Sequence, residues 1–176
     1  MPKVANIQRV KDLAYSQLRV SRERYEELIP TLYHSQYILL RWIASMTAVE
    51  VYAIWERYAE RRLTIALSNH PQHFFAANGI RGMKSIPVGL ATVLVRDGGR
   101  YFDFRSTSDL IDKGDRLVGR ADNPFRNLPA KLKKYLDTLG AIRNYIVHQS
   151  DSALAAYKNY LSSVYNVKSK PSPPEF

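Results

Sequence analysis

The stretch WIASMTAVEVYAIW, residues 42–55, is apolar on nearly every side of a helix and carries one charge, Glu50. A helix that is hydrophobic all round is buried in a bundle or at a subunit interface. We therefore expect a long helix from about Thr31 or Ser35 to Leu67, at the centre of a helical fold. A carboxylate in such a helix is costly unless it is paired, so Glu50 needs a partner elsewhere in the chain.

Apolar residues at helical spacing continue on both sides of this segment. An N-terminal helix is predicted from about Val4 to Leu28, with Pro30 ending the run. Further along, apolar residues alternate steps of four and three and so form a stripe on one helix face: Leu128, Leu132, Tyr135, Leu139, Ile142 and Ile146. A last helix is expected from about Asp151 to Val164, with Ser150 at its start.

The segment from Ser68 to about Pro124 differs, because it loses helical periodicity and holds seven of the eight glycines. Within it, ATVLV and RYFDF flank an Asp-Gly-Gly turn, which indicates a β-hairpin at about 91–105. We interpret 68–124 as an insertion between helices. The sequence thus predicts an all-α bundle with a small β-hairpin insertion, a single domain over 1–165 and a disordered tail at 166–176.

Composition narrows the classes of function. The net charge of +10 favours a polyanionic partner, and nucleic acid or an anionic membrane surface is the usual one. Because the chain has no cysteine, disulfides, thiol nucleophiles, zinc–thiolate sites and iron–sulfur clusters are excluded. The N-terminus does not resemble a secretory signal. Every window of about 18 residues that is otherwise apolar contains a charged residue. We therefore expect a cytoplasmic protein without a membrane span.

Three strong hydrogen-bonding residues lie together in RNYIVH, residues 143–148, at the end of the striped helix. On a wheel of about 100° per residue, Asn144 and His148 lie one turn apart and nearly opposite the apolar stripe. Arg143 lies on the flank, about 140° from His148 by the same geometry. His148 is therefore expected to face solvent or a second interface rather than the core.

These residue types suit one chemistry. Histidine titrates near neutral pH and serves as general acid or base, while arginine presents a planar fork of donors that matches phosphate. Asparagine orients an imidazole or holds a phosphate oxygen. Such a set cleaves RNA by activating the ribose 2′-OH against its own phosphate, with arginine stabilising the developing charge. RNA supplies the nucleophile, so neither a metal nor another cofactor is required.

The hexapeptide RNYIVH resembles the signature of the HEPN superfamily, which is Arg, a polar residue, three to five more residues and then His. The striped helix before it is similar to that family, as is the earlier long helix HSQYILLRWIASMTAVEVYAIW, which looks most like the RiboL-PSP-HEPN branch. The resemblance covers residues 31–68 and 124–165. It implies a helical bundle, a homodimer and metal-independent endoribonuclease activity, typically in a toxin–antitoxin or phage-defence setting with an antitoxin partner.

The resemblance also implies roles for single residues. His148 would be the general acid or base, Arg143 the phosphate contact and Asn144 an orienting group. Glu50 matches the acidic residue of the family's long helix, and Arg143 is its natural partner, either in a purely structural ion pair or in one that orients the arginine. The motif groups would converge across a two-fold axis between two copies, or through a bend near Gly140.

Contacts to RNA are expected at basic residues of two helices and at Tyr145 beside the motif. The basic residues are Arg57, Arg61, Arg62, Lys131, Lys133 and Lys134. His70 and His73 have a spacing that suits a metal, but no third ligand lies nearby, so no metal site is expected. Two other functions remain open: a non-catalytic RNA- or nucleotide-binding module using the same pocket, and a structural protein that binds a partner.

Overall fold

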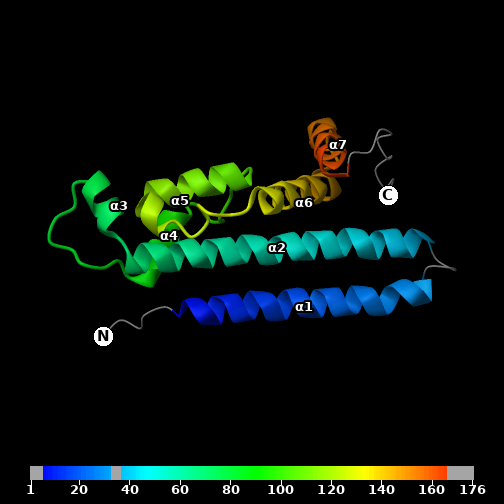
Figure 1. Cartoon of the computed structure of the whole chain (residues 1–176), viewed down its shortest axis with the longest axis horizontal. Coiled ribbons are helices and arrows are strands. Elements are labelled where there is room, and N and C mark those ends of the chain that lie inside the picture. The colour runs from blue at the N-terminus through cyan, green and yellow to red at the C-terminus, as the bar shows by residue number, and fades with distance from the viewer. Residues whose placement is uncertain (1–5, 33–36, 166–176) are drawn as a thin grey trace. The chain divides into compact units, whose positions relative to one another are not determined.

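The computed structural model describes residues 6–32 and 37–165, and all regular elements in this part of the chain are α-helices (Figure 1). In chain order they are α1 (Ile7–Leu32), α2 (Tyr37–Asn69), α3 (Gln72–Ala77), α4 (Val88–Val95), α5 (Thr107–Asp122), α6 (Ala130–His148) and α7 (Asp151–Tyr165). The predicted all-α class is confirmed. The disordered tail predicted at 166–176 lies outside the described residues.

The chain divides into two compact units. Unit 1 comprises Met1–Ala14 and Trp55–Leu128, and unit 2 comprises Tyr15–Ile54 and Pro129–Phe176. The helices α1 and α2 each contribute one part to unit 1 and the other part to unit 2. The 68–124 segment therefore lies wholly in unit 1, whereas the motif at 143–148 lies wholly in unit 2.

Unit 1 holds the main hydrophobic core. Leu63 and Leu67 of α2 and Leu110 of α5 are fully buried, and Phe125 is 2% exposed. The ring of Phe125 meets Trp55 edge-on, with ring centroids 5.7 Å apart, an arrangement that adds to the stabilisation from burial. The glycine-rich segment interpreted as an insertion between helices is therefore an ordered part of the fold, because it supplies α3, α4, α5 and much of this core.

The β-hairpin predicted at about 91–105 is contradicted by the structure. Residues 88–95 form α4, and the chain from 101 to 105 has no partner strand within the described residues. The run VGLATVLV buries Ala91 and Val95, one helical turn apart, and a short apolar run suits a buried helix as well as a strand. Phe102 and Phe104 alternate with exposed neighbours as a strand would, but their rings pack together in the core, with centroids 5.4 Å apart, and no strand lies beside them in the described residues.

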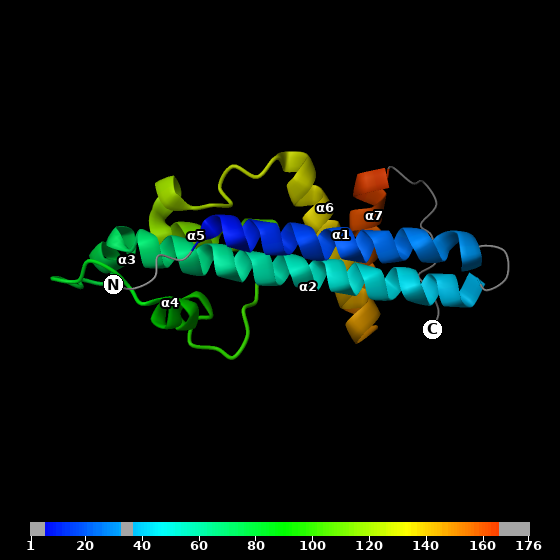
Figure 2. The same cartoon turned by 90° about the horizontal axis from the view of Figure 1, so that it is seen from below.

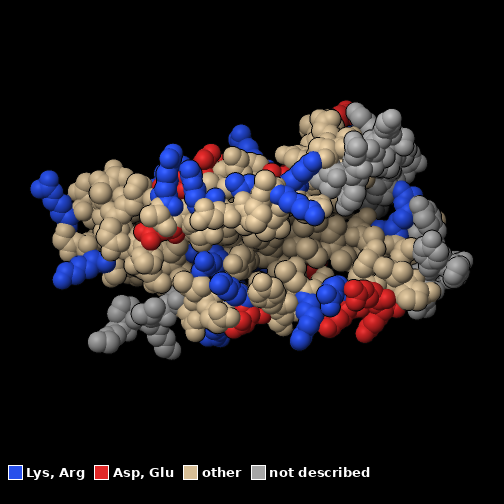
Figure 3. Space-filling view, viewed as in Figure 1, with Lys and Arg blue, Asp and Glu red and all other residues tan. Residues whose placement is uncertain are grey.

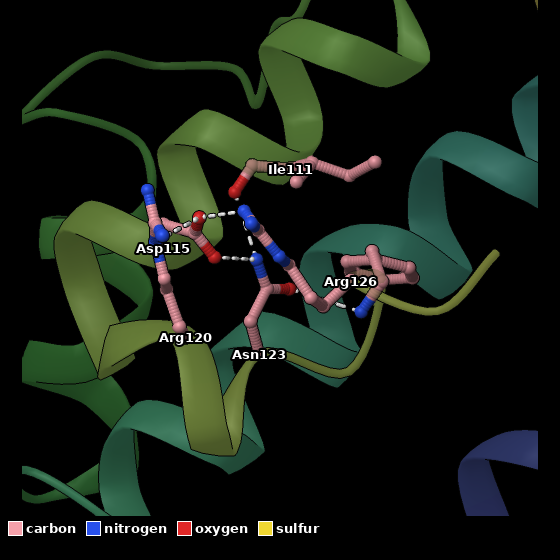
Figure 4. Close-up of polar contacts among 6 residues, drawn as sticks. Ile111, Asp115, Arg120, Asn123 and Arg126 are labelled. Atoms are coloured by element: carbon pink, nitrogen blue, oxygen red, sulfur yellow. Dashed lines mark hydrogen bonds and ion pairs between the residues drawn. The ribbon is translucent and has the colours of Figure 1, made fainter.

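Asn123 fixes the loop that follows α5 (Figure 4). Its side-chain nitrogen donates to the carbonyl oxygen of Ile111 at 2.8 Å and to Oδ1 of Asp115 at 2.7 Å. Its Oδ1 accepts a hydrogen bond from the backbone nitrogen of Phe125 at 2.9 Å. Asp115 also pairs with Arg126. The polar atoms of a buried side chain are thus satisfied internally, and this positions Phe125 for the core.

Gly114 of α5 faces this network, because a Cβ at position 114 would lie 2.6 Å from Oδ1 of Asn123. Glycine to alanine in an open helix position normally stabilises by up to about 1 kcal/mol. Gly114→Ala is instead expected to lower the free energy of unfolding by about 1–3 kcal/mol, because Asn123 must give up buried hydrogen bonds. Urea titration followed by circular dichroism measures this change.

Gly89→Ala is the matched control for this prediction. Gly89 lies in α4, and nothing lies within 4 Å of the Cβ it would gain. The control should therefore be neutral or slightly stabilising. Equal effects of the two substitutions would contradict the role given to the Asn123 network.

Helix α2 is long and apolar enough to cross a bilayer by length and composition. Within Ile38–Asn69, one window has a mean hydropathy of 1.3, and 17% of that window is buried. We expected no segment of this kind, because every apolar window contains a charge. That expectation was therefore too strong. Length and composition do not by themselves separate a membrane span from an interface helix.

Candidate functional site

The motif at 143–148 occupies the C-terminal end of α6, which crosses α2 at a steep angle within unit 2 (Figure 2). The two helices approach closely at Gly140, where a Cβ would lie 3.1 Å from the hydroxyl oxygen of Tyr52. Tyr52 is buried, with 6% of its surface exposed. Helix α6 continues through Gly140 without interruption, so this glycine permits a close approach of helices and does not bend the motif.

Arg143 and Asn144 are in direct contact. Nη1 of Arg143 donates to Oδ1 of Asn144 at 2.8 Å, and the guanidinium carbon lies 6.0 Å from the centroid of the Tyr52 ring. Arg143 is half-buried, whereas Asn144 and His148 are exposed, so the prediction that His148 lies outside the core is confirmed. Asn144 and His148 lie one turn apart. The hydrogen bond therefore holds the guanidinium against Asn144.

Glu50 does not join this group. It is exposed, and its Oε2 accepts a hydrogen bond from the hydroxyl of Ser21 in α1 at 3.0 Å. Tyr52 faces Arg143, and Glu50 lies about 200° away from Tyr52 around the helix, so its side chain points elsewhere. The expected proximity of Glu50 to Arg143 is therefore not found in the described chain, and the single chain gives Glu50 a structural contact only.

Tyr145, expected to contact RNA, packs between two helices. Its ring stacks on Tyr157 of α7, with centroids 5.4 Å apart and an interplanar angle of 21°. Burial raises the pKa of Tyr157 and the nearby Tyr145 adds to this rise, while Arg41 of α2 acts in the opposite direction. The structure thus gives Tyr145 a role in holding α7 against the motif helix.

The raised pKa of Tyr157 predicts a pH dependence of stability. The folded chain keeps the hydroxyl proton of Tyr157 to a higher pH than the unfolded chain does, because the pKa in the unfolded chain is 10.0. The resulting stabilisation is complete below the unfolded pKa and is lost as the pH rises through the folded pKa. Tyr157→Phe keeps the stacked ring, so it is expected to lose less stability than the wild type between about pH 9 and pH 11.

Urea midpoints measured across this pH range provide the test. Tyr15→Phe is the control, because Tyr15 is 73% exposed, and it should follow the wild type. Parallel curves for Tyr157→Phe and the wild type would show that burial of this hydroxyl does not matter to stability.

The basic residues predicted to contact RNA are divided between the two units. Three of them lie on α6 and share unit 2 with the motif: Lys131, Lys133 and Lys134. The other three lie on α2 and belong to unit 1: Arg57, Arg61 and Arg62. Nζ of Lys134 donates to the backbone oxygen of Ser163 in α7, and Lys131 lies 5.8 Å from the centroid of the Tyr135 ring. Within unit 2, Lys131, Lys133 and Lys134 therefore lie on the same helix as the motif.

Acidic side chains gather over the C-terminal part of α1 (Figure 3), whose acidic residues are Glu23, Glu26 and Glu27. Glu23 and Glu26 pair with the arginines one turn earlier, at 3.7 and 3.5 Å, in exposed positions. Such pairs contribute little to stability. Arg19, Arg22 and Arg24 balance the three carboxylates, so this part of α1 has no net charge of its own.

Unit 1 contains a cleft of about 540 Å³ that the sequence patterns did not indicate. Four basic and four acidic residues line it: Arg96, Arg105, Lys113, Arg116, Asp97, Asp103, Asp109 and Asp112. Asp97 pairs with Lys113 at 3.0 Å and with Arg116 at 2.9 Å. Because opposite charges balance within it, the cleft presents no field that favours a polyanion. Asp97 of this cleft belongs to the Asp-Gly-Gly turn that was interpreted as part of a hairpin.

The two histidines considered for a metal contact α5 in unit 1. Nδ1 of His70 lies 3.8 Å from Oδ1 of Asp122, and the ring of His73 lies against Gly119, where a Cβ would be 3.0 Å away. No group of three histidine, aspartate or glutamate side chains suited to a metal occurs among residues 6–32 and 37–165. Both histidine side chains are exposed.

Comparison with known protein families, with curated proteins and with solved structures finds no match for this chain. The likeness to HEPN proteins therefore rests on the motif at 143–148 and on the helices around it. The function has to be inferred from the site itself.

Proposed function

We propose that the chain is a metal-independent endoribonuclease of the HEPN type, with Arg143, Asn144 and His148 as its reacting groups. The observation that carries the proposal is the 2.8 Å contact between Arg143 and Asn144, on the helix end that also exposes His148. A held guanidinium and an accessible imidazole are the groups that transfer of an RNA phosphate to its own 2′-oxygen requires.

In this reaction His148 takes the proton of the ribose 2′-OH, and the 2′-oxygen attacks the adjacent phosphorus. Arg143 neutralises the charge that grows on the non-bridging oxygens. The bond from phosphorus to the 5′-oxygen breaks, and that oxygen leaves with a proton from a second acid. The products are a 2′,3′-cyclic phosphate and a 5′-hydroxyl. Each chain supplies one His148, so a second copy provides the second acid.

The biological setting follows from the same likeness. A toxin–antitoxin or phage-defence role in the cytoplasm fits an RNA-cleaving protein, and an antitoxin would bind its basic surface. A genomic neighbour encoding a nucleotidyltransferase-like or acidic protein would support this pairing.

A matched pair of substrates tests the reaction. An RNA oligonucleotide and the same sequence built from 2′-deoxyribose are incubated with the protein in excess EDTA. We expect cleavage of the RNA alone, with 2′,3′-cyclic phosphate ends identified by mass spectrometry. Cleavage of the deoxy strand, or 3′-hydroxyl ends on the RNA fragments, would rule out attack by the 2′-oxygen.

A second candidate function is a non-catalytic module that binds RNA or a nucleotide. It is favoured by the fact that Arg143 is bonded to Asn144, because these two residues can hold a phosphate without the histidine. In that case the RNA oligonucleotide is retained in a gel-shift assay but stays intact, and His148→Ala changes the affinity only modestly.

A further inference from the structure

Within unit 2, where α6 crosses α2 (Figure 2), the two helices meet at the side chain of Tyr52. Its hydroxyl oxygen lies 3.1 Å from the position that a Cβ of residue 140 would take. The centroid of its ring lies 6.0 Å from the guanidinium carbon of Arg143. Gly140 and Arg143 are three residues apart and therefore share a face of α6. The ring of Tyr52 thus lies against the turn of α6 that carries Arg143.

The guanidinium of Arg143 has a neighbour on each of these helices. On α6 its Nη1 donates to Oδ1 of Asn144 at 2.8 Å, and on α2 it lies over the ring of Tyr52. An aromatic face attracts a cation within about 6 Å, and the attraction strengthens where water is excluded. Tyr52 is buried and Arg143 is half-buried, so the contact is partly shielded from water. Together the two contacts restrict a side chain that otherwise samples many rotamers.

We propose that Tyr52 is a positioning residue of the nuclease site, whose ring holds the guanidinium of Arg143 in place for the phosphate before RNA binds. The inference rests on the proposed function and adds a residue to it. A preorganised charge stabilises the transition state without having to reorganise at the moment of reaction. A misplacement of about 1 Å lowers the rate of an enzyme by as much as about 10²-fold.

An aromatic ring suits this role better than the carboxylate that was expected to pair with Arg143. The expected partner, Glu50, accepts a hydrogen bond from Ser21 of α1 instead. A carboxylate occupies the same N–H donors that a phosphate needs, and it neutralises the positive charge. A ring attracts the cation without cancelling its charge. Tyr52 therefore leaves Arg143 with its full positive charge for the phosphate.

Replacements at position 52 separate the attraction between ring and cation from packing. Tyr52→Phe keeps the ring and should leave kcat for RNA cleavage within about threefold of the wild type. Trifluorophenylalanine at position 52 keeps the shape of that ring, but its fluorine atoms withdraw electron density from the ring face. We expect kcat to fall a further 5- to 10-fold or so, with KM changed little, because the contact acts in the transition state. Tyr52→Leu removes the ring face and should lower kcat by about 10- to 100-fold.

Tyr58→Leu is the matched control for these variants. Tyr58 is a partly buried tyrosine of the same helix, but it packs on the core of unit 1. The control should cleave RNA at the rate of the wild type, although it loses packing contacts. Thermal unfolding checks that every protein is folded at the assay temperature. If Tyr52→Leu does not fold, the comparison of Tyr52→Phe with the fluorinated ring still decides, because those two rings have the same shape.

A second measurement does not depend on cleavage. Protons over the face of an aromatic ring are shifted upfield by its ring current, so the side-chain NMR signals of Arg143 report the contact directly. Arg143→Lys assigns these signals. We expect upfield shifts in the wild type and in Tyr52→Phe, and their loss in Tyr52→Leu. A wild type that does not cleave RNA would overturn the proposed function, and the shifts would still decide whether Tyr52 holds the guanidinium.

Three results would each overturn the positioning role of Tyr52. The first is an equal kcat for Tyr52→Phe and for the fluorinated ring, because the strength of the ring face would then not matter. The second is an unshifted Arg143 signal in the wild type. The third is a loss of kcat in Tyr58→Leu equal to that in Tyr52→Leu, because weaker packing alone would then explain both.

Discussion

His148→Ala is expected to lower the rate of RNA cleavage by about 10²- to 10⁴-fold, the usual effect of losing a positioned general base. His148 is the last residue of α6 and is exposed, so its removal leaves no cavity in either unit. Substitutions at such positions change stability by about 0.5 kcal/mol or less. Single-turnover rates on a defined RNA oligonucleotide measure the loss, and thermal unfolding checks the fold.

His70→Ala is the matched control for this prediction. It removes another exposed imidazole, with 54% of its side chain accessible, but from unit 1. Its cleavage rate should equal that of the wild type. A full rate in His148→Ala, or the same loss in both variants, would show that the histidine of the motif is not the reacting group.

Phe125→Ala is expected to lower the free energy of unfolding by about 3–5 kcal/mol, the usual cost of removing a buried phenyl ring. Phe125 is 2% exposed and packs edge-on against Trp55, so its loss leaves a cavity in the core of unit 1. Urea unfolding followed by far-ultraviolet circular dichroism measures the change.

Tyr101→Ala provides the comparison for Phe125→Ala. It also removes an aromatic ring from unit 1, but this ring is 75% exposed. We expect a change of about 0.5 kcal/mol or less. If Phe125→Ala costs no more than Tyr101→Ala, then the core does not lie where the structure places it.

Apolar periodicity was sufficient to predict the long helices, because each has a face that must be buried over many turns. It indicated the type and approximate extent of α2, α6 and α7. It was less reliable at the end of α1, which continues past Pro30 to Leu32, since a proline near a helix terminus removes one hydrogen bond without ending the helix. It failed at 91–105, where the core accepts Phe102 and Phe104 without a strand beside them.

The exposed position of His148 was also predictable, because it depends only on the angle from the apolar stripe of α6. The partner of Glu50 was not, since the spacing within α2 does not show which neighbouring helix each face meets. The structure shows that Tyr52 faces α6, while Glu50 bonds to α1. A bend near Gly140 was one of the two alternatives for a related reason. Whether a glycine bends a helix or admits a neighbouring ring depends on what lies opposite it.

One gel tests the central claim most directly. Purified wild type and His148→Ala, shown to elute at the same volume, are incubated with a mixed pool of transfer and messenger RNA in excess EDTA. We expect RNA fragments from the wild type and intact RNA from the variant. Intact RNA with the wild type, or equal fragmentation by both proteins, would contradict a metal-independent nuclease that acts through His148.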